Sequence, residues 1–502
     1  MTISAPARPG SADREAVTGV LKAAYDAYLY VGRPCANCHP AHLATIATLI
    51  GHQAPDPATA RVLEIGCGDG GNLVPMAAAL PGATFVGIDL SSLAIGEARA
   101  FASALALSNV TFHDADLRDL PADVGPFDYV VAHGFYSWVP APVRLAMFET
   151  IRARLAPCGV AFVSHNVMPG CGLRQMVWDV LKPHVAGIDD PVARIAEARA
   201  MAAKVAESMA QQPGLPSALA IEFREIADRP GFAVLHDDLA AVNHPVLLRD
   251  IVAEGATHGL AWIGDADLFR HSAPAFGETM NAWLAAADRL TREHVIDHMR
   301  LRRYRESLFV HDGAAKAAAP DARRLAAMHA AATNATVERH AAKQDRGAPP
   351  LQRALIERLV DVHPGSVPIE ELVALIAAQA GAGSPLASRD NALLLLLNAA
   401  YAGVIVPLGA PAGIAARASD RPRAFAPARW QAPRHDFVVN LRHDGVAFTD
   451  PAMRALLPLV DGTRDRDALV ASLTSVAPTM RDPRRALDEY LAHFARLGIL
   501  DA

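Results

Sequence analysis

One short segment, an apolar run that ends in an acid and then in alternating glycines, constrains the fold of this chain most. Residues Val62 to Gly70 read Val-Leu-Glu-Ile-Gly-Cys-Gly-Asp-Gly, and a helical stretch follows them. Glycine lacks a Cβ atom, so it permits a sharp turn and a close approach of the backbone to a ligand. A strand, a glycine turn and a helix in this order are the context that nucleotide binding requires.

Further apolar strands follow this turn at intervals that fit an alternating β/α chain. We expect strands at 84–89, 109–113, 127–133 and 159–164, with helices over 92–107 and 142–155. Strands that alternate with helices predict a parallel sheet whose ligand lies over the carboxyl ends of the strands. Asp89 ends the second strand, where an acid can hold two ribose hydroxyls. The alternative is a Rossmann-like fold that binds another nucleotide, or none.

The length of 502 residues predicts two or three domains, because a single core of this size is unusual. A helix followed by a glycine and an apolar strand at 259–264 indicates a sixth strand. We interpret the basic stretch 290–311 as a solvated helix face, or alternatively as a contact for an acidic substrate. The expected units are an N-terminal helical lid (1–52), a cofactor-binding domain (53–270) with a helical insertion at about 173–235, a helical regulatory or linker region (271–348) and a mainly α, winged-helix-like C-terminal domain (349–502).

Composition indicates which kinds of partner and which cellular compartment to expect. The formal net charge of −6 argues against binding to nucleic acid through bulk positive charge. The first 14 residues lack the apolar core of a secretory signal, and the apolar run 392–408 is interrupted, which favours a buried helix and strand over a membrane span. Five cysteines imply no disulfide framework. We therefore expect a cytoplasmic protein with no membrane and no nucleic-acid partner.

Cys35-Ala-Asn-Cys38-His39 matches the C-x-x-C-H pattern of c-type haem attachment. Haem attachment requires export to an oxidising compartment, for which we find no signal. A single C-x-x-C pair also lacks the four ligands of a structural zinc site. The interpretation is chance spacing, and no metal site is predicted.

The acid and the glycines from Glu64 to Gly70 have the E/D-x-G-x-G-x-G spacing of class I S-adenosylmethionine (SAM) methyltransferases, which this segment resembles. Other segments make the chain similar, over about residues 20–315, to methyltransferases that carry a methyltransferase regulatory domain. That family includes bacterial lysine methyltransferases of outer-membrane surface proteins. The resemblance implies a Rossmann-like sheet of seven strands, with SAM as methyl donor and S-adenosylhomocysteine as product. The segments that carry it are 133–140, 164–170, 236–239, 243–245, 259–264 and 302–311.

Three departures from this family fall near the expected mouth of the active site. His165 and Cys171 stand where related sequences tend to have tyrosine and tryptophan. The segment Arg33–Cys38 replaces a proline-aromatic-glutamine segment. These departures bear on the methyl acceptor and not on the donor.

The resemblance implies a role for each part of the glycine turn. Glu64, Gly66 and Gly68 would face the methionine part of SAM, Asp89 the ribose and Asp116 the adenine amine. Tyr25 and Tyr28 on the N-terminal helix would close over the cofactor. The predicted cofactor-binding residues are Glu64, Gly66, Cys67, Gly68, Gly70, Asn72, Asp89, Leu90, Asp116, Leu117, His133 and Tyr28.

Lysine methylation requires a neutral amine aligned with the donor methyl group. Deprotonation from a pKa near 10.4 costs roughly 4 kcal/mol at pH 7.4, and an apolar aromatic channel lowers that pKa. Tyr136 and Trp138 are the predicted aromatic wall, with ordinary loop packing as the alternative. His133 and His165 are candidate proton acceptors, although a structural role is the simpler reading, and Asn166 is a candidate to orient the amine or the methionine carboxylate.

The favoured activity is N-methylation of lysine in a protein substrate. One alternative is methylation of a small molecule or natural-product intermediate. Another is a SAM-binding regulator without catalysis, whose winged helices contact partners. Nucleic-acid methylation is disfavoured because no Asn-Pro-Pro-aromatic motif follows the fourth strand. The helical insertion makes a homodimer plausible, but the sequence sets neither the acceptor nor the number of methyl groups.

Overall fold

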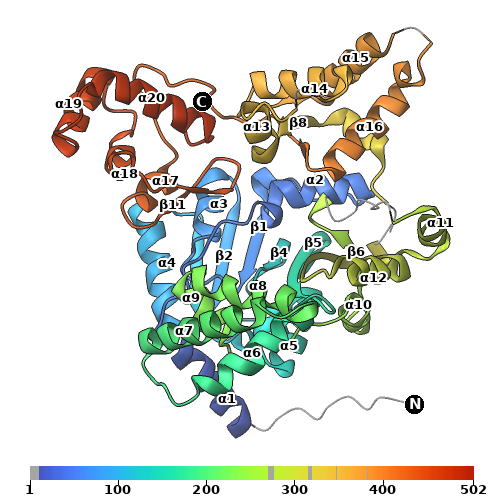
Figure 1. Cartoon of the computed structure of the whole chain (residues 1–502), viewed down its shortest axis with the longest axis vertical. Helices are drawn as coiled ribbons and strands as arrows, with labels where there is room; N and C mark the ends of the chain where they lie inside the picture. The colour runs from blue at the N-terminus through green and yellow to red at the C-terminus, as the bar shows by residue number, and fades with distance from the viewer. Residues whose placement is uncertain (1–10, 269–275, 315–318, 346, 382) are drawn as a thin grey trace.

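The computed structural model describes residues 11–268, 276–314, 319–345, 347–381 and 383–502. Figure 1 shows an α/β body with two lobes formed by the C-terminal third of the chain. The N-terminal helix α1 (Ser11–Ala27) lies at the opposite end of the body from these lobes. Residues 1–10 of the expected N-terminal lid fall outside the described ranges.

A seven-stranded mixed sheet forms the centre of the body, which confirms the expected Rossmann-like class. Its strand order is β3-β2-β1-β4-β5-β7-β6. The first five strands run parallel, and β7 is antiparallel to both of its neighbours. The strands are β1 (Arg61–Ile65), β2 (Thr84–Asp89), β3 (Val110–Asp114), β4 (Phe127–Ala132), β5 (Leu155–Asn166), β6 (Leu260–Asp265) and β7 (Tyr304–His311).

Strand β7 corrects two expectations about the region after residue 270. Residues 271–348 are not wholly helical, because α11 (Glu278–Ala286) and α12 (Arg289–Arg300) lead into β7, which lies between β5 and β6. The basic stretch is not a solvated helix face either, since Arg305 on β7 is fully buried. The strand was not predicted because its first residues are charged. Its second half, Leu308 to Val310, is apolar and lies in the core.

Arg305 is held by acids from two neighbouring elements. Its guanidinium contacts Asp265 at the end of β6, Glu293 Oε2 at 2.8 Å and Asp297 Oδ1 at 2.8 Å, the latter two on α12. Asp265 and Asp297 are also almost fully buried. A charge removed from water needs such paired, hydrogen-bonded partners, so this network fixes α12 against the β6–β7 edge of the sheet.

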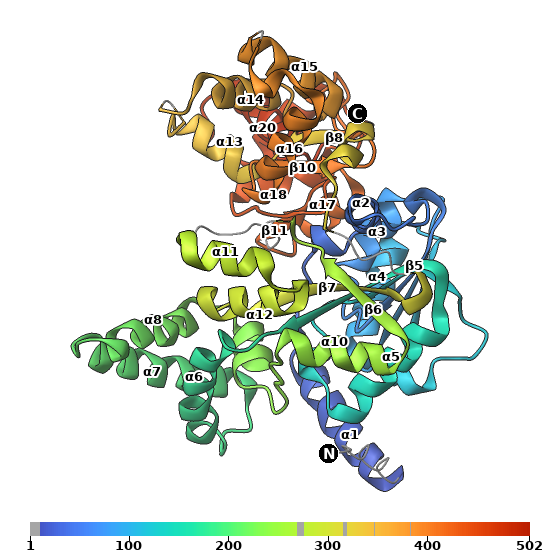
Figure 2. The same ribbon diagram turned by 90° about the vertical axis from the view of Figure 1, so that its right-hand side faces the viewer.

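Helices cover both faces of the sheet, as Figure 2 shows. Alternate residues of β1 and β4 pack into two separate cores, because successive side chains of a strand point to opposite faces. One face packs against α2 (Pro40–Ile50), α3 (Leu73–Ala79) and α4 (Ser92–Ala104), and the other against α5 (Ala141–Arg154) and α10 (Leu248–Thr257).

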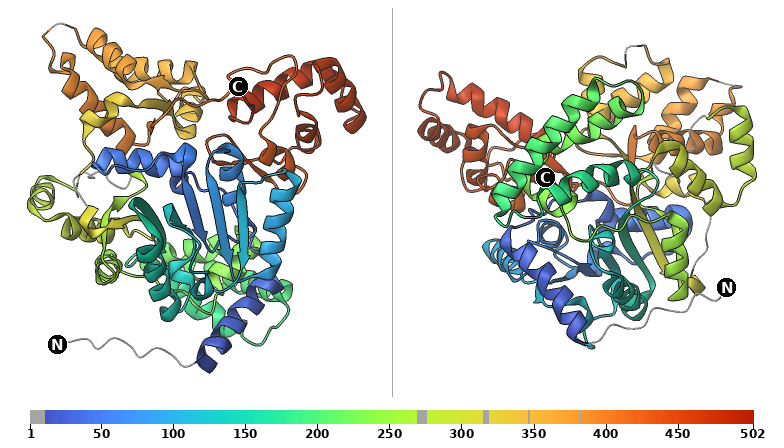
Figure 3. Two further views of the ribbon diagram at one scale, coloured as in Figure 1. Left: turned by 180° about the vertical axis from the view of Figure 1, so that it is seen from behind. Right: turned by 60° about the horizontal axis from the view of Figure 1, so that its bottom comes forward.

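The insertion between β5 and β6 is helical, as expected, and has a small core of its own. Val177, Leu181, Ala198 and Phe223 belong to this core. Figure 3 shows the insertion and α1 on the side of the sheet away from the C-terminal lobes. Its elements are α6 (Cys171–His184), α7 (Pro191–Ala210), α8 (Leu215–Asp228), α9 (Gly231–Ala233) and the π-helical segment Val234–Asp238.

The first C-terminal lobe combines a three-stranded sheet with four helices. The expected helix and strand over 392–408 are α16 and β10, and both bury apolar residues. Strand β8 pairs with β10, so this lobe includes residues before the expected start at 349. Its elements are β8 (His329–Ala332), α13 (Asn334–Ala341), α14 (Pro350–Asp361), β9 (Val367–Pro368), α15 (Ile369–Ala380), α16 (Arg389–Tyr401) and β10 (Ile405–Leu408).

The second lobe packs against α4 of the central body through α17. Trp430 of α17 stacks on Phe101 of α4, with ring centroids 4.0 Å apart. Within the described ranges, no helix has the length and apolarity needed to cross a bilayer. The elements of this lobe are α17 (Ala426–Gln431), β11 (Phe437–Val439), β12 (Gly445–Ala447), α18 (Pro451–Leu456), α19 (Arg466–Val476) and α20 (Pro483–Arg496).

The burial of Arg305 yields a stability prediction. Substitution Arg305→Leu removes the cation that contacts Asp265, Glu293 and Asp297, although Arg302 still pairs with Glu293 and Asp297. Removing one partner of a buried ion pair costs about 3–5 kcal/mol. We expect a lower urea midpoint for loss of far-UV circular dichroism. The matched control is Arg323→Leu, whose exposed guanidinium pairs with Asp321 at the surface. Equal midpoints for the two variants would contradict a structural role for the network.

Candidate active site

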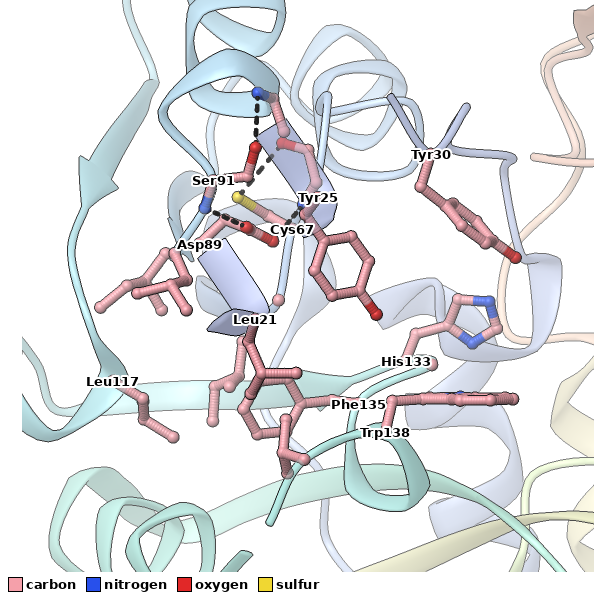
Figure 4. Close-up of a pocket in the computed structure, with 18 of the residues that line it drawn as sticks. Leu21, Tyr25, Tyr30, Cys67, Asp89, Ser91, Leu117, His133, Phe135 and Trp138 are labelled. Carbon is pink, nitrogen blue, oxygen red and sulfur yellow. Dashed lines mark hydrogen bonds between the residues drawn. The ribbon is translucent and has the colours of Figure 1, made fainter. Parts of the chain in front are cut away.

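A cavity of about 360 Å³ lies at the carboxyl ends of β1, β2 and β4. Its walls come from α1, the segment 30–33, the loop 133–143 and the insertion at 232–237. Figure 4 shows Asp89, Ser91 and Cys67 toward one end of it and His133 and Trp138 toward the other. The predicted site residues that line it are Glu64, Gly66, Cys67, Gly68, Asn72, Asp89, Leu90, Asp116, Leu117, His133 and Trp138.

The glycine turn brings backbone against the cavity at two positions with positive φ. Gly68 has φ +53°, and a Cβ atom there would meet no atom within 4 Å, so it would project into open space. Gly66 has φ +74°, and its Cβ would lie 2.7 Å from the ring of Phe135. Glycine is therefore required at Gly66 both by conformation and by the neighbouring ring.

Asp89 is fixed by two backbone amides at the end of β2. Gly68 N–H donates to Oδ2 at 2.9 Å, and Ser91 N–H donates to Oδ1 at 2.8 Å. Desolvation raises the pKa of Asp89 despite these hydrogen bonds. Each carboxylate oxygen accepts only one of these bonds and can accept another. The two oxygens can therefore accept hydrogen bonds from the two hydroxyls of a diol.

Glu64 ends β1 almost fully buried. Its Oε1 accepts a hydrogen bond of 2.6 Å from Asn72 Nδ2, whereas Oε2 has no hydrogen-bond partner among the described residues. Desolvation raises the pKa of Glu64 to about 7. A buried acceptor that lines a cavity without a partner favours a ligand with a cationic donor at this point.

Asn72 links four segments through its side-chain amide. Nδ2 donates to Glu64 and to Cys38 Sγ at 3.2 Å. Oδ1 accepts from Cys35 N–H at 2.9 Å and lies 2.8 Å from His443 Nε2 in the second C-terminal lobe. Desolvation lowers the pKa of His443 well below its usual range, so the neutral ring must carry its proton on Nε2 to donate here.

His133 follows β4 and faces several acidic groups. Burial opposes its protonation, but Cys35, Glu64 and Glu306 together raise its pKa to about 9. Its Nδ1 lies 3.4 Å from the hydroxyl of Tyr304. Near neutral pH the imidazole is therefore cationic, which does not suit the expected role as a proton acceptor.

The N-terminal segment closes one side of the cavity. Asp69 accepts hydrogen bonds of 3.0 and 3.1 Å from Gly32 N–H, which ties this segment to the glycine turn. Lys22 Nζ donates to the carbonyl of Leu90 at 2.9 Å. Tyr25 lines the cavity and stacks on His236 of the insertion, with ring centroids 4.7 Å apart.

Three predicted catalytic side chains do not line the cavity. Tyr136 is buried, and its hydroxyl donates to Glu254 Oε2 at 2.5 Å. His165 is buried with its Nε2 3.1 Å from Ser307 Oγ. Asn166 Nδ2 donates to Asn243 Oδ1 at 3.1 Å and thereby holds the loop after the insertion. The expected aromatic wall is therefore wrong for Tyr136, because the loop turns that ring into the core.

Two predicted cofactor residues also lie outside the lining. Gly70 packs beneath the turn against Val74 and Ala98 of the flanking helices. Tyr28 packs against the core of the insertion, whereas Tyr25, which was expected to cover the cofactor together with Tyr28, lines the cavity, as does Tyr30. The helix containing Tyr25 ends at Ala27, so the side-chain directions beyond it do not follow helical spacing.

Several lining residues were not singled out in the sequence. Phe232 and Asp237 come from the insertion, and only the resemblance of segment 236–239 pointed to that region. Desolvation raises the pKa of Asp237 to about 7, against the attraction of Arg229, whose Nη2 lies 2.7 Å from Oδ2. The other residues are Thr18, Leu21, Val31, Gly32, Arg33, Ile65, Ile88, Ser91, Ala94, Ala115, Arg118, Gly134, Phe135, Val139, Pro140, Pro142 and Val143.

The acceptor groups and apolar walls of the cavity fit SAM, the cofactor that the resemblance implies. Asp89 stands where a ribose would be held, and the apolar side chains of Leu117 and Val143 offer walls for an adenine ring. Glu64 Oε2 offers an acceptor to the cationic amine of a methionine moiety. The volume lies within the range of small-molecule sites, about 300–1,000 Å³.

Three family models match separate parts of the chain. The model described as a methyltransferase domain matches residues 62–159, which run from β1 into the first half of β5. The model described as a predicted methyltransferase regulatory domain matches 232–311, which includes β6 and β7. The model described as the C-terminal winged helix domain of PKMT matches 420–480 in the second C-terminal lobe.

Two of the curated relatives come from Rickettsia prowazekii. One uncharacterized protein is 32% identical over 291 residues, which is 57% of this chain and 52% of that protein. The chain thus spans about half the length of this relative. A second uncharacterized protein is 30% identical over 224 residues, which is 44% of this chain and 89% of that protein.

A solved structure shares the fold over nearly the whole chain. PKMT2 from Rickettsia typhi superposes with a TM-score of 0.81 at 20% identity, covering 94% of this chain and 100% of that chain. The same protein in complex with AdoHcy gives the same TM-score. The chain therefore belongs to the SAM-dependent methyltransferases that combine a methyltransferase domain, a methyltransferase regulatory domain and a PKMT-type C-terminal winged helix domain.

Proposed function

We propose that this protein transfers the methyl group of SAM to the side-chain amine of lysine in a protein substrate. The observation that carries this proposal is the aromatic lining at the His133 end of the cavity, where Trp138, Tyr30 and Phe232 all contribute rings. Aromatic faces stabilise a cationic, methylated amine by about 0.5–2 kcal/mol. The winged helix domain described for PKMT and the fold of PKMT2, with AdoHcy bound in one structure, agree with this acceptor.

The residues of the cavity would hold the donor by charge and shape. Glu64 would pair with the amine of its methionine part, Asp89 would accept from the ribose hydroxyls, and Leu117 would cover the adenine. Bound SAM supplies an electrophilic methyl group on a sulfonium. The chain then has to align the acceptor with that methyl group and exclude water, and alignment contributes much of the acceleration in such reactions.

His133 would favour the neutral form of the acceptor amine. Its pKa of about 9 keeps the imidazole cationic near neutral pH, and a nearby cation lowers the pKa of a second basic group. The aromatic rings add desolvation, which acts in the same direction. We therefore assign His133 an electrostatic role and do not assign it the acceptance of the proton.

The direct test is methyl transfer to protein. The purified chain would be incubated with SAM labelled on its methyl group and with a lysate of the bacterium that encodes it. We expect acid-stable label in protein, recovered as methyllysine after hydrolysis, and none with Asp89→Ala, which removes the ribose-facing carboxylate. Label confined to small molecules would replace the protein acceptor with a small one. Measured SAM binding without any label would favour a regulator.

Glu64 gives a pH-dependent prediction for SAM affinity. Since its pKa is about 7, the carboxylate becomes charged between pH 6 and pH 7.5, and SAM affinity should rise roughly five- to tenfold over that interval. Glu64→Gln keeps the shape but not the charge, so its affinity should be weaker at pH 7.5 and nearly independent of pH. Isothermal titration at both pH values measures the difference.

The stability of the unliganded protein should respond to the same substitution with the opposite sign. A carboxyl group whose pKa is raised from 4.5 to about 7 on folding destabilises the folded state as pH rises through that interval. Glu64→Gln should therefore unfold at a higher temperature than the wild type at pH 8, although it binds SAM more weakly. If Glu64→Gln lowered both the unfolding temperature at pH 8 and the SAM affinity, the Glu64 carboxylate would not be a buried charge that lacks a partner in the unliganded protein.

Trp138 and Tyr136 provide a matched pair for the acceptor wall. Trp138→Ala should lower kcat/KM for the acceptor about tenfold, which corresponds to 1–2 kcal/mol of aromatic contact, while SAM affinity stays within twofold. Tyr136→Phe should leave kcat/KM unchanged and lower stability by about 1 kcal/mol, because it removes the hydrogen bond to Glu254. A loss of kcat/KM in Tyr136→Phe, with none in Trp138→Ala, would instead place Tyr136 in the aromatic wall of the acceptor site.

A further inference from the structure

Cys35 and Cys38 lie in one tight turn beside the active-site cavity. Cys38 is the last residue of the 3₁₀ helix Ala36–Cys38, for which Cys35 is the N-cap, and Cys38 N–H donates to Cys35 O at 3.2 Å. Cys35 itself is extended (φ −122°, ψ 103°), and the hydrogen bond from the fourth residue back to the first closes a turn whose end Cα atoms lie less than about 7 Å apart. That separation falls within the range that a disulfide spans.

The two thiols differ in exposure and in surroundings. Cys35 is half-buried, and its Sγ lies 4.0 Å from Glu306 Oε1. The pKa of Cys35 is lowered well below its usual range by hydrogen bonding with Cys38 in this turn, against desolvation, and then by the charge of His133. The Cys38 thiol donates to the carbonyl oxygen of Cys35 at 3.2 Å. Cys38 is fully buried, and desolvation raises its pKa. Other titratable groups that face Cys35 are His42, Glu64, Tyr304 and Asp444.

We propose that Cys35 and Cys38 form a redox modification site, at which a hydroperoxide converts the two thiols reversibly into an intramolecular disulfide. Both are free thiols in the structure. Cys35 is the reactive sulfur, since it is accessible and lies against His133. Cys38 is the resolving sulfur, since it is buried and lies three residues away in the same turn. Among the described residues, no group of His, Cys, Asp and Glu side chains converges as metal ligands.

The oxidation balances with the side chains already in place. The Cys35 thiolate attacks one oxygen of hydrogen peroxide, the O–O bond breaks, and His133 gives its proton to the departing hydroxide, which leaves as water. The Cys38 thiol then attacks the sulfenic acid of Cys35, the S–O bond breaks, and a second water carries away the hydroxyl and the thiol proton. Two electrons pass from the two sulfurs to the peroxide.

This oxidation would change the active-site cavity in two ways. His133 loses both its proton and the thiolate that held the proton, so a neutral imidazole faces the cavity. Cys38 Sγ turns toward Cys35 and gives up the hydrogen bond from Asn72, the residue that also holds Glu64. The disulfide itself depends on neither SAM nor an acceptor, so it can be tested apart from the proposed methyl transfer.

The test is oxidation of the full-length chain by hydrogen peroxide at pH 7, followed by alkylation and mass spectrometry. Both thiols lie in the tryptic peptide 23–61, because proline follows Arg33. We expect this peptide to become two hydrogens lighter and resistant to alkylation, and dithiothreitol to reverse both changes. The exposed thiol of Cys158 is the internal reference, and Cys35 should react about tenfold faster than Cys158 because more of it is thiolate.

Two variants separate the roles of the sulfurs and of the imidazole. Cys38→Ser should stop at a sulfenic acid on Cys35 that dimedone traps, with no disulfide. His133→Asn should slow the reaction of Cys35 about tenfold at pH 7, and a pH near 9.5 should restore the rate. The proposal fails if peptide 23–61 stays fully alkylatable while Cys158 is oxidised. It also fails if the wild type and Cys38→Ser give the same dimedone adduct.

Discussion

The side-chain amide of Asn72 is the contact on which the arrangement of the active-site cavity depends. Its two donors and its acceptor oxygen hold Glu64, Cys38, Cys35 and His443 at 2.6–3.2 Å. These partners come from β1, the N-terminal segment and the second C-terminal lobe. A buried amide with every hydrogen-bonding atom used fixes the geometry of its partners, because any displacement would leave a polar atom without a partner.

The Asn72 contact also explains how a distant lobe takes part in the site. His443 lies in the turn between β11 and β12, with its ring centroid 5.2 Å from that of His39 in the N-terminal segment. Its neutral ring donates to Asn72, so the second C-terminal lobe supplies one of the bonds that orient the Glu64 carboxylate. The second C-terminal lobe, which contains the winged helix domain, thus has a structural role beside the cavity.

The sequence predicted most of the sheet and the donor half of the cavity, because those features are local. Apolar runs such as Thr84–Asp89 form strands, and the acid and glycines from Glu64 to Gly68 lie on one turn. The acceptor half depends on which way individual side chains turn. Tyr136 points into the core, although it stands two residues from Trp138, and β7 was missed because Arg305 finds its acids on other elements. Neither outcome follows from local pattern.

Cys35 and Cys38 also show that a local sequence pattern does not determine which residues meet in space. Their spacing alone fits several chemistries, and without haem attachment or further zinc ligands it reads as chance. The fold shows which groups surround the pair, and the spacing alone does not. His133 follows β4, Glu306 lies on β7, and both are near the sulfur of Cys35. A motif of two residues acquires a chemical identity only through its neighbours in space. Here those neighbours are a cation that favours the thiolate and a buried second thiol one turn away.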